Sequence, residues 1–353
     1  SQLYGGVTSV RNQLFDWKVF RTEQYDLPII CVGNLTVGGT GKTPHTEYII
    51  RLIKDRYRVA VLSRGYKRKT SGFLLADQRS TSKDIGDEPY QIKRKFPDIL
   101  VAVDANRRRG IRNLLALPEN ECPEVIVLDD AFQHRYVTPT LNILLTDSHR
   151  LYTQDKLLPT GRLREPVDGA RRANVIIVTK CESCIQLIDF RIIEEDMHLS
   201  AYQELYFSQI LYGELEPVFS GKAPRRTLKG LASTTEVLLV SGIASPAPLE
   251  KEIHKYTEHV TSLVFPDHHA FDRHDIKKIQ MAFKRLTSTS KLIITTEKDA
   301  ARLRDLPSLP MEWLSHLYYL PITVGFCMDR EKQFQELIVK HINTRIKNHP
   351  ILR

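Results

Sequence analysis

One stretch near the N-terminus constrains the fold of this chain more than any other. It begins with the apolar run Leu27–Val32, passes through a turn that contains Gly38, Gly39 and Gly41, and continues as an amphipathic segment over 43–54. Glycines let backbone N–H groups curl around an anion, and a helix N-terminus adds donors and a favourable dipole. This order of strand, glycine turn and helix predicts a nucleotide-phosphate site in an α/β fold.

The turn matches the phosphate loop, or P-loop, except that the strict pattern begins with glycine where this chain has Thr36. Lys42 supplies a positive charge for the β- and γ-phosphates, and Thr43 supplies a hydroxyl for Mg²⁺. A glycine turn that arises by chance is the alternative. We expect ATP to be bound by Thr36, Val37, Gly38, Gly39, Thr40, Gly41, Lys42 and Thr43.

Further short apolar runs predict a doubly wound sheet. They are Arg58–Leu62, Ile99–Val103, Val125–Leu128, Leu141–Leu145 and Val175–Val178. Apolar character at almost every position is typical of parallel strands that are covered on both faces. The segments between the first four strands are long enough for crossover helices. The chain should therefore form a P-loop NTPase-like α/β fold with a mostly parallel sheet.

A second set of apolar runs predicts a second, smaller α/β domain, which suits a chain of 353 residues. A helix is expected over 274–287. We place a boundary near residue 200, with the P-loop domain over 23–200 and the second domain, which ends in a basic tail, over 201–353. The strands expected in the second domain are Tyr206–Leu211, Val237–Val240, Thr261–Phe265, Leu292–Thr295 and Tyr319–Val324.

The strand over Val125–Leu128 leads directly into Asp129 and Asp130. Carboxylates at the end of a buried strand are costly to leave unpaired, so a cation is expected beside them. We expect both aspartates to hold Mg²⁺, directly or through water, together with Thr43. The alternative is a capping or salt-bridged pair.

The net charge of +9 favours anionic partners, and nucleic acid, phosphorylated substrates and anionic lipid remain open. No apolar run is long enough to cross a bilayer, which excludes a polytopic membrane protein. Residues 1–22 predict an amphipathic helix, because Val7, Val10, Leu14 and Trp17 recur at steps of three and four. Such a helix either packs on the domain or lies in a membrane interface.

The five cysteines exclude a disulfide scaffold. Only Cys181 and Cys184 form a CxxC pair, which alone is weak evidence for zinc. We expect reduced thiols.

Several motifs, in order along the chain, resemble those of the tetraacyldisaccharide 4′-kinase family, the kinases of lipid A synthesis. The resemblance covers about residues 3 to 325. The matching segments are Val32–Pro44, Leu62–Tyr66, Gly86–Pro89, Leu128–Arg135, Leu158–Pro166, Val178–Lys180, Ser241–Pro246, Phe265–His269 and Thr295–Asp299.

The resemblance implies transfer of the ATP γ-phosphate to the 4′-hydroxyl of an acylated glucosamine disaccharide 1-phosphate. It implies a P-loop domain and a smaller α/β domain with the active site between them. It also favours the interfacial interpretation of residues 1–22, at the cytoplasmic face of the bacterial inner membrane. We accordingly expect a peripheral membrane protein that is monomeric and does not bind nucleic acid.

The resemblance also implies roles for individual residues. Asp87 would be the base that accepts the hydroxyl proton, with His268 as its partner, although chemistry alone does not choose between His268 and His269. The alternative for Asp87 is a turn or helix cap before Pro89.

Other residues carry roles by the same resemblance. Glu165 is a candidate for the metal or its water shell, and Lys180 for a contact to the nucleotide base. The candidates for contacts to phosphate or substrate are Arg64, Arg135 and Arg164. The alternative for each of them is a structural ion pair. The triplet Arg107–Arg109 is expected on a solvated helix face, and its second interpretation is a seat for the 1-phosphate of the substrate.

Two other functions compete. A P-loop GTPase or ATPase switch that acts on a protein would usually carry Asn-Lys-x-Asp, which Thr296–Asp299 matches only loosely. An ATPase that binds nucleic acid suits the charge, but the chain lacks aromatic and basic residues interleaved on a recognisable module.

Overall fold

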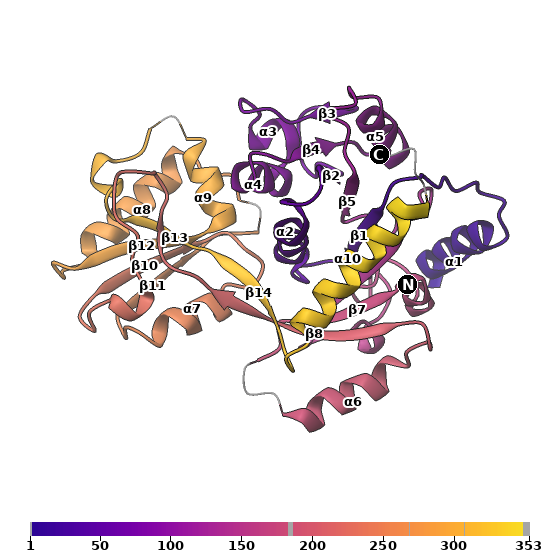
Figure 1. Ribbon diagram of the computed structural model, residues 1–353. Coiled ribbons are helices and arrows are strands. Elements are labelled where there is room, and N and C mark those ends of the chain that lie inside the picture. Colours follow the sequence, from indigo (N-terminus) through magenta and orange to yellow (C-terminus); the bar gives the residue numbers. More distant parts are fainter. Residues whose placement is uncertain (1, 183–185, 268, 307, 349–353) are drawn as a thin grey trace. The chain divides into compact units, whose positions relative to one another are not determined.

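The computed structural model describes residues 2–182, 186–267, 269–306 and 308–348, and Figure 1 shows its ribbon. The chain forms two compact units. The first contains the residues up to 210 together with those from 324 onward, and the second contains 211–323. Both the P-loop and the strand that ends in Asp129 belong to the first unit.

The first unit is built on a nine-stranded sheet in the order β14-β8-β7-β6-β1-β5-β2-β4-β3. The pairs from β4 to β8 are all parallel, and β3 pairs with β4 antiparallel. This topology confirms the predicted mostly parallel α/β fold. The strands are β1 (Ile29–Asn34), β2 (Val59–Ser63), β3 (Leu74–Leu75), β4 (Leu100–Val103), β5 (Val125–Asp129), β6 (Leu141–Asp147), β7 (Val175–Thr179), β8 (Glu204–Tyr212) and β14 (Ile322–Phe326).

Strands β1, β2, β5 and β7 are buried at every position, as expected for strands covered by helices on both faces. Their apolar side chains form the core of the unit. The helices are α1 (Gln2–Asp16), α2 (Lys42–Ile53), α3 (Ser82–Ile85), α4 (Asp87–Lys95), α5 (Arg107–Leu115), α6 (Leu187–Met197) and α10 (Glu331–Asn348), with short 3₁₀ helices η1 (Tyr152–Gln154) and η2 (Val167–Arg172).

The second unit has its own core around a five-stranded sheet in the order β11-β10-β12-β13-β9, which is parallel apart from the pair of β13 and β9. Its strands are β9 (Glu216–Pro217), β10 (Glu236–Ser241), β11 (Val260–Val264), β12 (Lys291–Thr296) and β13 (Leu317–Leu320). Its helices are α7 (Ala247–His254), α8 (Arg273–Arg285), α9 (Glu297–Arg304), η3 (Leu228–Gly230) and η4 (Met311–Trp313).

The C-terminal part of the chain differs from its expected place. The sequence assigned every residue from 201 onward to the second domain, but β8 as far as Ile210, the end of β14 and α10 belong to the first unit. Phe334, Ile338 and Ile342 form a buried stripe on α10, and the Phe334 ring stacks on Phe326 at 4.4 Å. As far as residue 348, the basic tail is thus part of a packed helix.

None of the helices in the part of the chain that the structure describes has the length and apolar character needed to cross a bilayer.

Candidate functional site

The P-loop follows β1 and is held in shape by its neighbours. Gly38 and Gly41 adopt φ values of 111° and 82°, which disfavour any side chain. The Asn34 Nδ2 amide donates to Thr40 Oγ1 at 2.8 Å, and the Thr179 hydroxyl donates to the Thr40 carbonyl at 3.0 Å. The loop is therefore preorganised from β1 on one side and β7 on the other.

The segment before η2 supports the start of the same loop. The Val37 N–H donates to the Arg162 carbonyl at 2.8 Å, and the Arg164 N–H donates to the Leu35 carbonyl at 2.7 Å. Thr36, which replaces the first glycine of the strict pattern, is buried and forms an antiparallel bridge with Leu163. The substitution fits because Thr36 packs as a short strand residue.

Lys42 and Asp130 face each other across the loop. The Lys42 Nζ lies 3.7 Å from Asp130 Oδ1, and Arg164 Nη1 donates to both Asp130 oxygens at 3.1 and 3.2 Å. Burial pushes the pKa of Asp130 upward, but the two cations outweigh it and hold that pKa below its usual value. Asp130 is thus an anion paired with the P-loop lysine and with Arg164.

Asp129 has the opposite electrostatics. Its side chain is buried and accepts a hydrogen bond from the Thr46 hydroxyl at 3.2 Å. Burial, with the negative charges of Glu88 and Asp130 nearby, raises the pKa of Asp129 to about 7. The site therefore has an excess of carboxylate that a bound cation would relieve. Glu88 was missed by the sequence analysis, although it lies beside Asp87 in the Gly86–Pro89 motif.

The described part of the chain contains no ready cage for a metal. Among the described residues, no three His, Cys, Asp or Glu side chains come together as a metal site. Glu165 accepts hydrogen bonds from Arg172 Nη2 at 2.8 and 2.9 Å, from Asn12 at 3.2 Å and from Gln133 at 3.2 Å. Both of its oxygens already have protein donors, so a direct metal–Glu165 bond would have to displace at least one of them.

Arg107 is a buried part of the site, whereas the sequence placed it on a solvated face. Its guanidinium donates to the carbonyl of Asp104 at 2.8 Å and to that of Asp129 at 3.4 Å. Its neighbours are also occupied, because Arg108 pairs with Glu23 at 3.3 Å and Arg109 with Asp104 at 2.8 Å. The triplet is thus engaged by protein groups.

His134 is a further polar group that the sequence analysis quoted only inside a motif. Burial, together with the charges of Arg107 and Arg108, lowers the pKa of His134 to about 4, so the ring is neutral at physiological pH. Its Nε2 is buried and has no hydrogen-bond partner among the described residues.

The remaining arginine candidates differ in how they are held. Arg135 donates to the Asn12 carbonyl at 2.9 Å and pairs with Asp16 at 2.6 Å, which fastens α1 to the loop after β5. Arg64 follows β2 with an exposed side chain that forms no hydrogen bond or ion pair with the described part of the chain. Arg64 is therefore the candidate most available to an anionic ligand.

Asp87 is the first residue of α4, and its position depends on Gly86. The φ of Gly86 is 92°, and a Cβ there would lie 2.9 Å from the Tyr66 carbonyl oxygen. His268 lies outside the described residues. His269 is engaged within the second unit, because its Nε2 lies 2.7 Å from Asp275 Oδ2.

Lys180 and the cysteine pair complete the candidates. The Lys180 Nζ pairs with Asp147 at 2.6 Å, where β6 and β7 end beside each other. Cys181 is buried and its thiol donates to the Val178 carbonyl at 3.5 Å, while Cys184 lies outside the described residues.

Comparisons of sequence with known proteins identify one family. The family of tetraacyldisaccharide-1-P 4′-kinases matches residues 1–343. The tetraacyldisaccharide 4′-kinase of Parabacteroides distasonis is 92% identical over 353 residues, which cover 100% of this chain and 96% of that protein. The enzyme of the same name from Bacteroides thetaiotaomicron is 50% identical over 354 residues, covering 99% of this chain and 93% of that protein.

A solved structure resembles the whole chain. It is the "apo" form of LpxK from Aquifex aeolicus in complex with ATP, which is 28% identical in sequence and has a TM-score of 0.72. The match covers 97% of this chain and 97% of that chain.

Proposed function

The chain belongs to the tetraacyldisaccharide-1-P 4′-kinase family, and we infer from this that it transfers the γ-phosphate of ATP to the 4′-hydroxyl of tetraacyldisaccharide 1-phosphate. It is thus a lipid kinase of lipid A biosynthesis. The observation that carries this conclusion is the 92% identity over the full chain. The preorganised P-loop, with Lys42 and Thr43 at its end, supports it independently.

We propose that residues 36–43 bind the ATP phosphates. Backbone N–H groups around Gly38 and Gly41 would surround the β-phosphate, and the N-terminus of α2 would add its dipole. Lys42 would leave Asp130 for the β- and γ-phosphates, where its charge stabilises the negative charge that spreads over the transferred group.

The residues present fit a magnesium ion. Mg²⁺ prefers oxygen ligands and usually combines one or two carboxylates with substrate phosphates and water, rather than a cage made only of protein. Thr43 and Asp129 would hold it, with Asp130 and Glu165 acting through water. When bound, the ion would supply positive charge that offsets the negative charge developing on the transferred phosphate. The observation that favours a cation here is that the Asp129 carboxylate is buried close to the carboxylates of Glu88 and Asp130.

The acceptor hydroxyl needs a base, because it is a poor nucleophile while it keeps its proton. We propose Asp87 for this role, at the N-terminus of α4, and His268 as the group that orients it and steadies the proton. A carboxylate alone has a pKa near 4 and is a weak base, so a partner matters. Turnover of Asp87→Asn and His268→Gln tests the pair, and near-normal rates in both variants would exclude it as the catalytic base and its partner.

We further propose that Arg64 contacts a phosphate of ATP or substrate, since its side chain is exposed and the buried guanidinium of Arg107 nearby adds positive charge to this region. Arg164 would position Asp130, and Arg135 would position α1.

The acceptor is a membrane lipid, so the protein must meet a membrane surface. The α1 side chains of Val7 and Val10 are exposed, and so is Trp17 directly after the helix. We propose that α1 lies in the interface at the cytoplasmic face of the inner membrane, and that the protein is a peripheral monomer.

One assay tests the function. Purified protein is incubated with ATP, Mg²⁺ and the disaccharide 1-phosphate in detergent, and the bis-phosphorylated product is sought by mass. ATP hydrolysis that a protein or DNA stimulates, with no lipid product, would instead favour a P-loop switch.

A further inference from the structure

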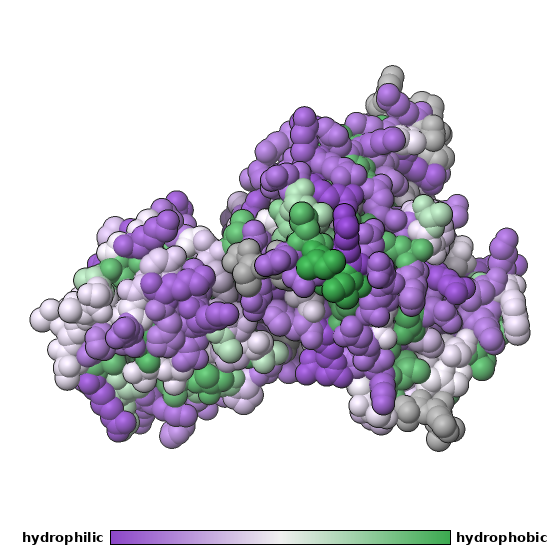
Figure 2. All heavy atoms as spheres, turned by 90° about the horizontal axis from the view of Figure 1, so that it is seen from below, coloured by the Kyte–Doolittle hydropathy of each residue, from purple (hydrophilic) through white to green (hydrophobic). Residues whose placement is uncertain are grey.

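Helix α6 presents large apolar side chains to solvent. Leu187, Ile188 and Ile192 are 67%, 56% and 58% exposed, whereas Phe190 on the opposite side is buried against Phe207 of β8. In Figure 1, α6 is the lowest helix of the first unit. Figure 2 views the protein from below, and hydrophobic residues gather over this helix. An exposed apolar cluster of this kind marks an interaction site.

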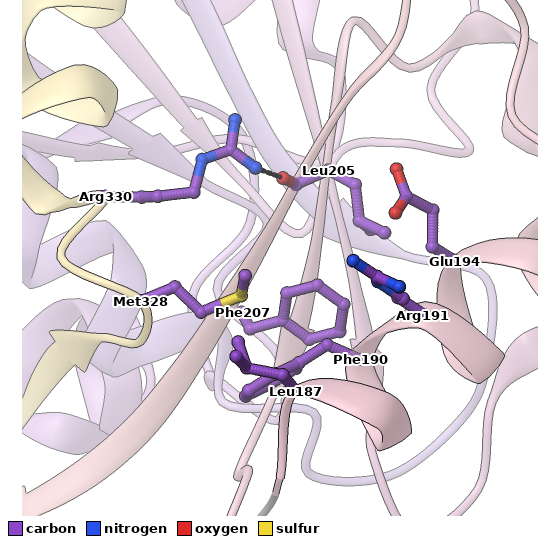
Figure 3. A pocket seen from close by; sticks show the side chains of 8 residues that line it. All are labelled: Leu187, Phe190, Arg191, Glu194, Leu205, Phe207, Met328 and Arg330. Carbon is purple, nitrogen blue, oxygen red and sulfur yellow. Dashed lines mark hydrogen bonds between the residues drawn. The ribbon is translucent and has the colours of Figure 1, made fainter.

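A pocket of about 190 Å³ opens beside these residues. Phe190, Leu205 and Phe207 line its inner part, and Leu187 and Met328 form its wall. Figure 3 shows Phe190, Phe207, Leu187 and Met328 close together, with Arg330 to one side of them and Arg191 and Glu194 of α6 to the other. An apolar interior beneath a charged rim suits the end of an acyl chain whose headgroup stays outside.

The apolar face of α6 is connected to α1 by the segment over 153–164. At one end of this segment, the Gln154 amide donates to Asp196 of α6 at 2.9 Å. At its other end, the Tyr4 hydroxyl of α1 donates to the Arg164 carbonyl at 2.8 Å. The same segment thus fastens both helices, each of which carries exposed apolar residues.

The connecting segment carries charge of the sign that attracts anionic lipid. Lys156 and Arg162 are exposed, and their side chains form no hydrogen bond or ion pair within the described ranges. Each such cation near an anionic surface contributes about 1 kcal/mol of attraction. Helix α6 itself carries four acidic side chains and one basic side chain, Arg191, so α6 would bind through its apolar residues and the attraction to anionic lipid would come from the connecting segment.

We propose that α6 and its pocket form a second membrane contact, which acts with α1 to seat the first unit on anionic phospholipid. The proposal rests on the proposed function only in that the substrate resides in a membrane. Two contacts fix how a protein is oriented on a bilayer, whereas a single helix leaves it free to pivot.

The test uses the full chain and co-sedimentation with phosphatidylcholine vesicles, with or without phosphatidylglycerol. Leu187→Ser/Ile188→Ser/Ile192→Ser should weaken binding to the mixed vesicles at least about tenfold, because three large apolar side chains no longer leave water. The matched control is Met281→Ser/Met311→Ser, which alters exposed apolar residues of the second unit and should change nothing. Lys156→Gln/Arg162→Gln should weaken binding only where phosphatidylglycerol is present.

A direct readout is Ile192→Trp in a Trp17→Phe background. Its fluorescence should shift to the blue on mixed vesicles and be quenched by lipids with brominated chains. Unchanged vesicle binding by the triple serine variant, or an Ile192→Trp spectrum that vesicles do not alter, would overturn the proposal. A lipid-free dimer that the triple variant abolishes would overturn it too, since a second copy would then be the occupant.

Kinase activity on substrate dispersed in detergent separates this proposal from the proposed function. The triple serine variant should retain the parent rate there. A parent protein that makes no product in detergent would refute the kinase activity and leave the vesicle result to stand by itself.

Discussion

Removing the guanidinium of Arg172 should destabilise the first unit and loosen the P-loop together. Glu165 is only 4% exposed, and Arg172 Nη2 donates to both of its oxygens at 2.8 and 2.9 Å. Breaking a buried ion pair on one side costs about 3–5 kcal/mol, because the remaining charge is left without compensation. The Arg172 side chain is itself 23% exposed, so water compensates part of the loss and we expect about 2–4 kcal/mol for Arg172→Met.

The effect should reach ATP binding through Gln133. This side chain donates to Glu165 at 3.2 Å and to the carbonyl of Asn34, at the start of the P-loop, at 2.7 Å. A carboxylate without its arginine would draw Gln133 away from Asn34. The assay is urea unfolding of Arg172→Met, followed by the KM for ATP in the kinase reaction.

Arg171→Met is the control. Arg171 lies next in the chain, but its side chain is 76% exposed and its ion pair with Asp168 is equally open to water. Such surface pairs contribute less than about 1 kcal/mol. The reasoning is refuted if the two variants unfold with free energies within about 0.5 kcal/mol of each other, or if Arg172→Met leaves the KM for ATP unchanged.

Three further outcomes follow from the site. Lys42→Met should reduce turnover at least about 100-fold while urea unfolding stays cooperative, since it removes a charge that the transferred phosphate meets; turnover near the parent value would exclude Lys42 from catalysis. Gly86→Ala should lower the free energy of unfolding by about 1–2 kcal/mol, because the new Cβ would meet the Tyr66 carbonyl at a positive φ, and an unchanged urea midpoint would contradict this. The pKa of Asp104 is lowered because hydrogen bonds and charge from Arg109 outweigh burial, so its stabilising effect is present above about pH 4 and is lost as the pH falls through the lowered folded-state pKa. Asp104→Asn should therefore have a lower free energy of unfolding than the parent at neutral pH, and that free energy should fall less steeply as the pH is lowered below about 4. A fall as steep as that of the parent would count against this assignment.

Local patterns in the sequence were enough to predict six strands of the first sheet and the P-loop. The runs over β1, β2 and β5 are apolar at nearly every position, and Gly38 and Gly41 occur where the backbone turns left-handed. Parallel strands and a phosphate loop have such signals because burial and backbone angle act residue by residue.

Other features depended on contacts between distant residues. The return of α10 to the first unit rests on the packing of Phe334 against Phe326 and Tyr206, which no local pattern encodes. Arg107 looked solvated within a basic triplet, yet its guanidinium is buried because the carbonyls of Asp104 and Asp129 accept its donors. The ion pair of Glu165 with Arg172 likewise joins two side chains that no local pattern in the sequence pairs.

The central claim concerns which atom receives the phosphate. The most direct measurement incubates the parent protein with ATP labelled at the γ-phosphate and tetraacyldisaccharide 1-phosphate, and then locates the label by fragmentation mass spectrometry. We expect the label on the 4′-oxygen of the distal glucosamine, with one ADP formed per product and at least about 100-fold less product from Lys42→Met. Label released only as free phosphate, or attached at any other position of the acceptor, would contradict the account.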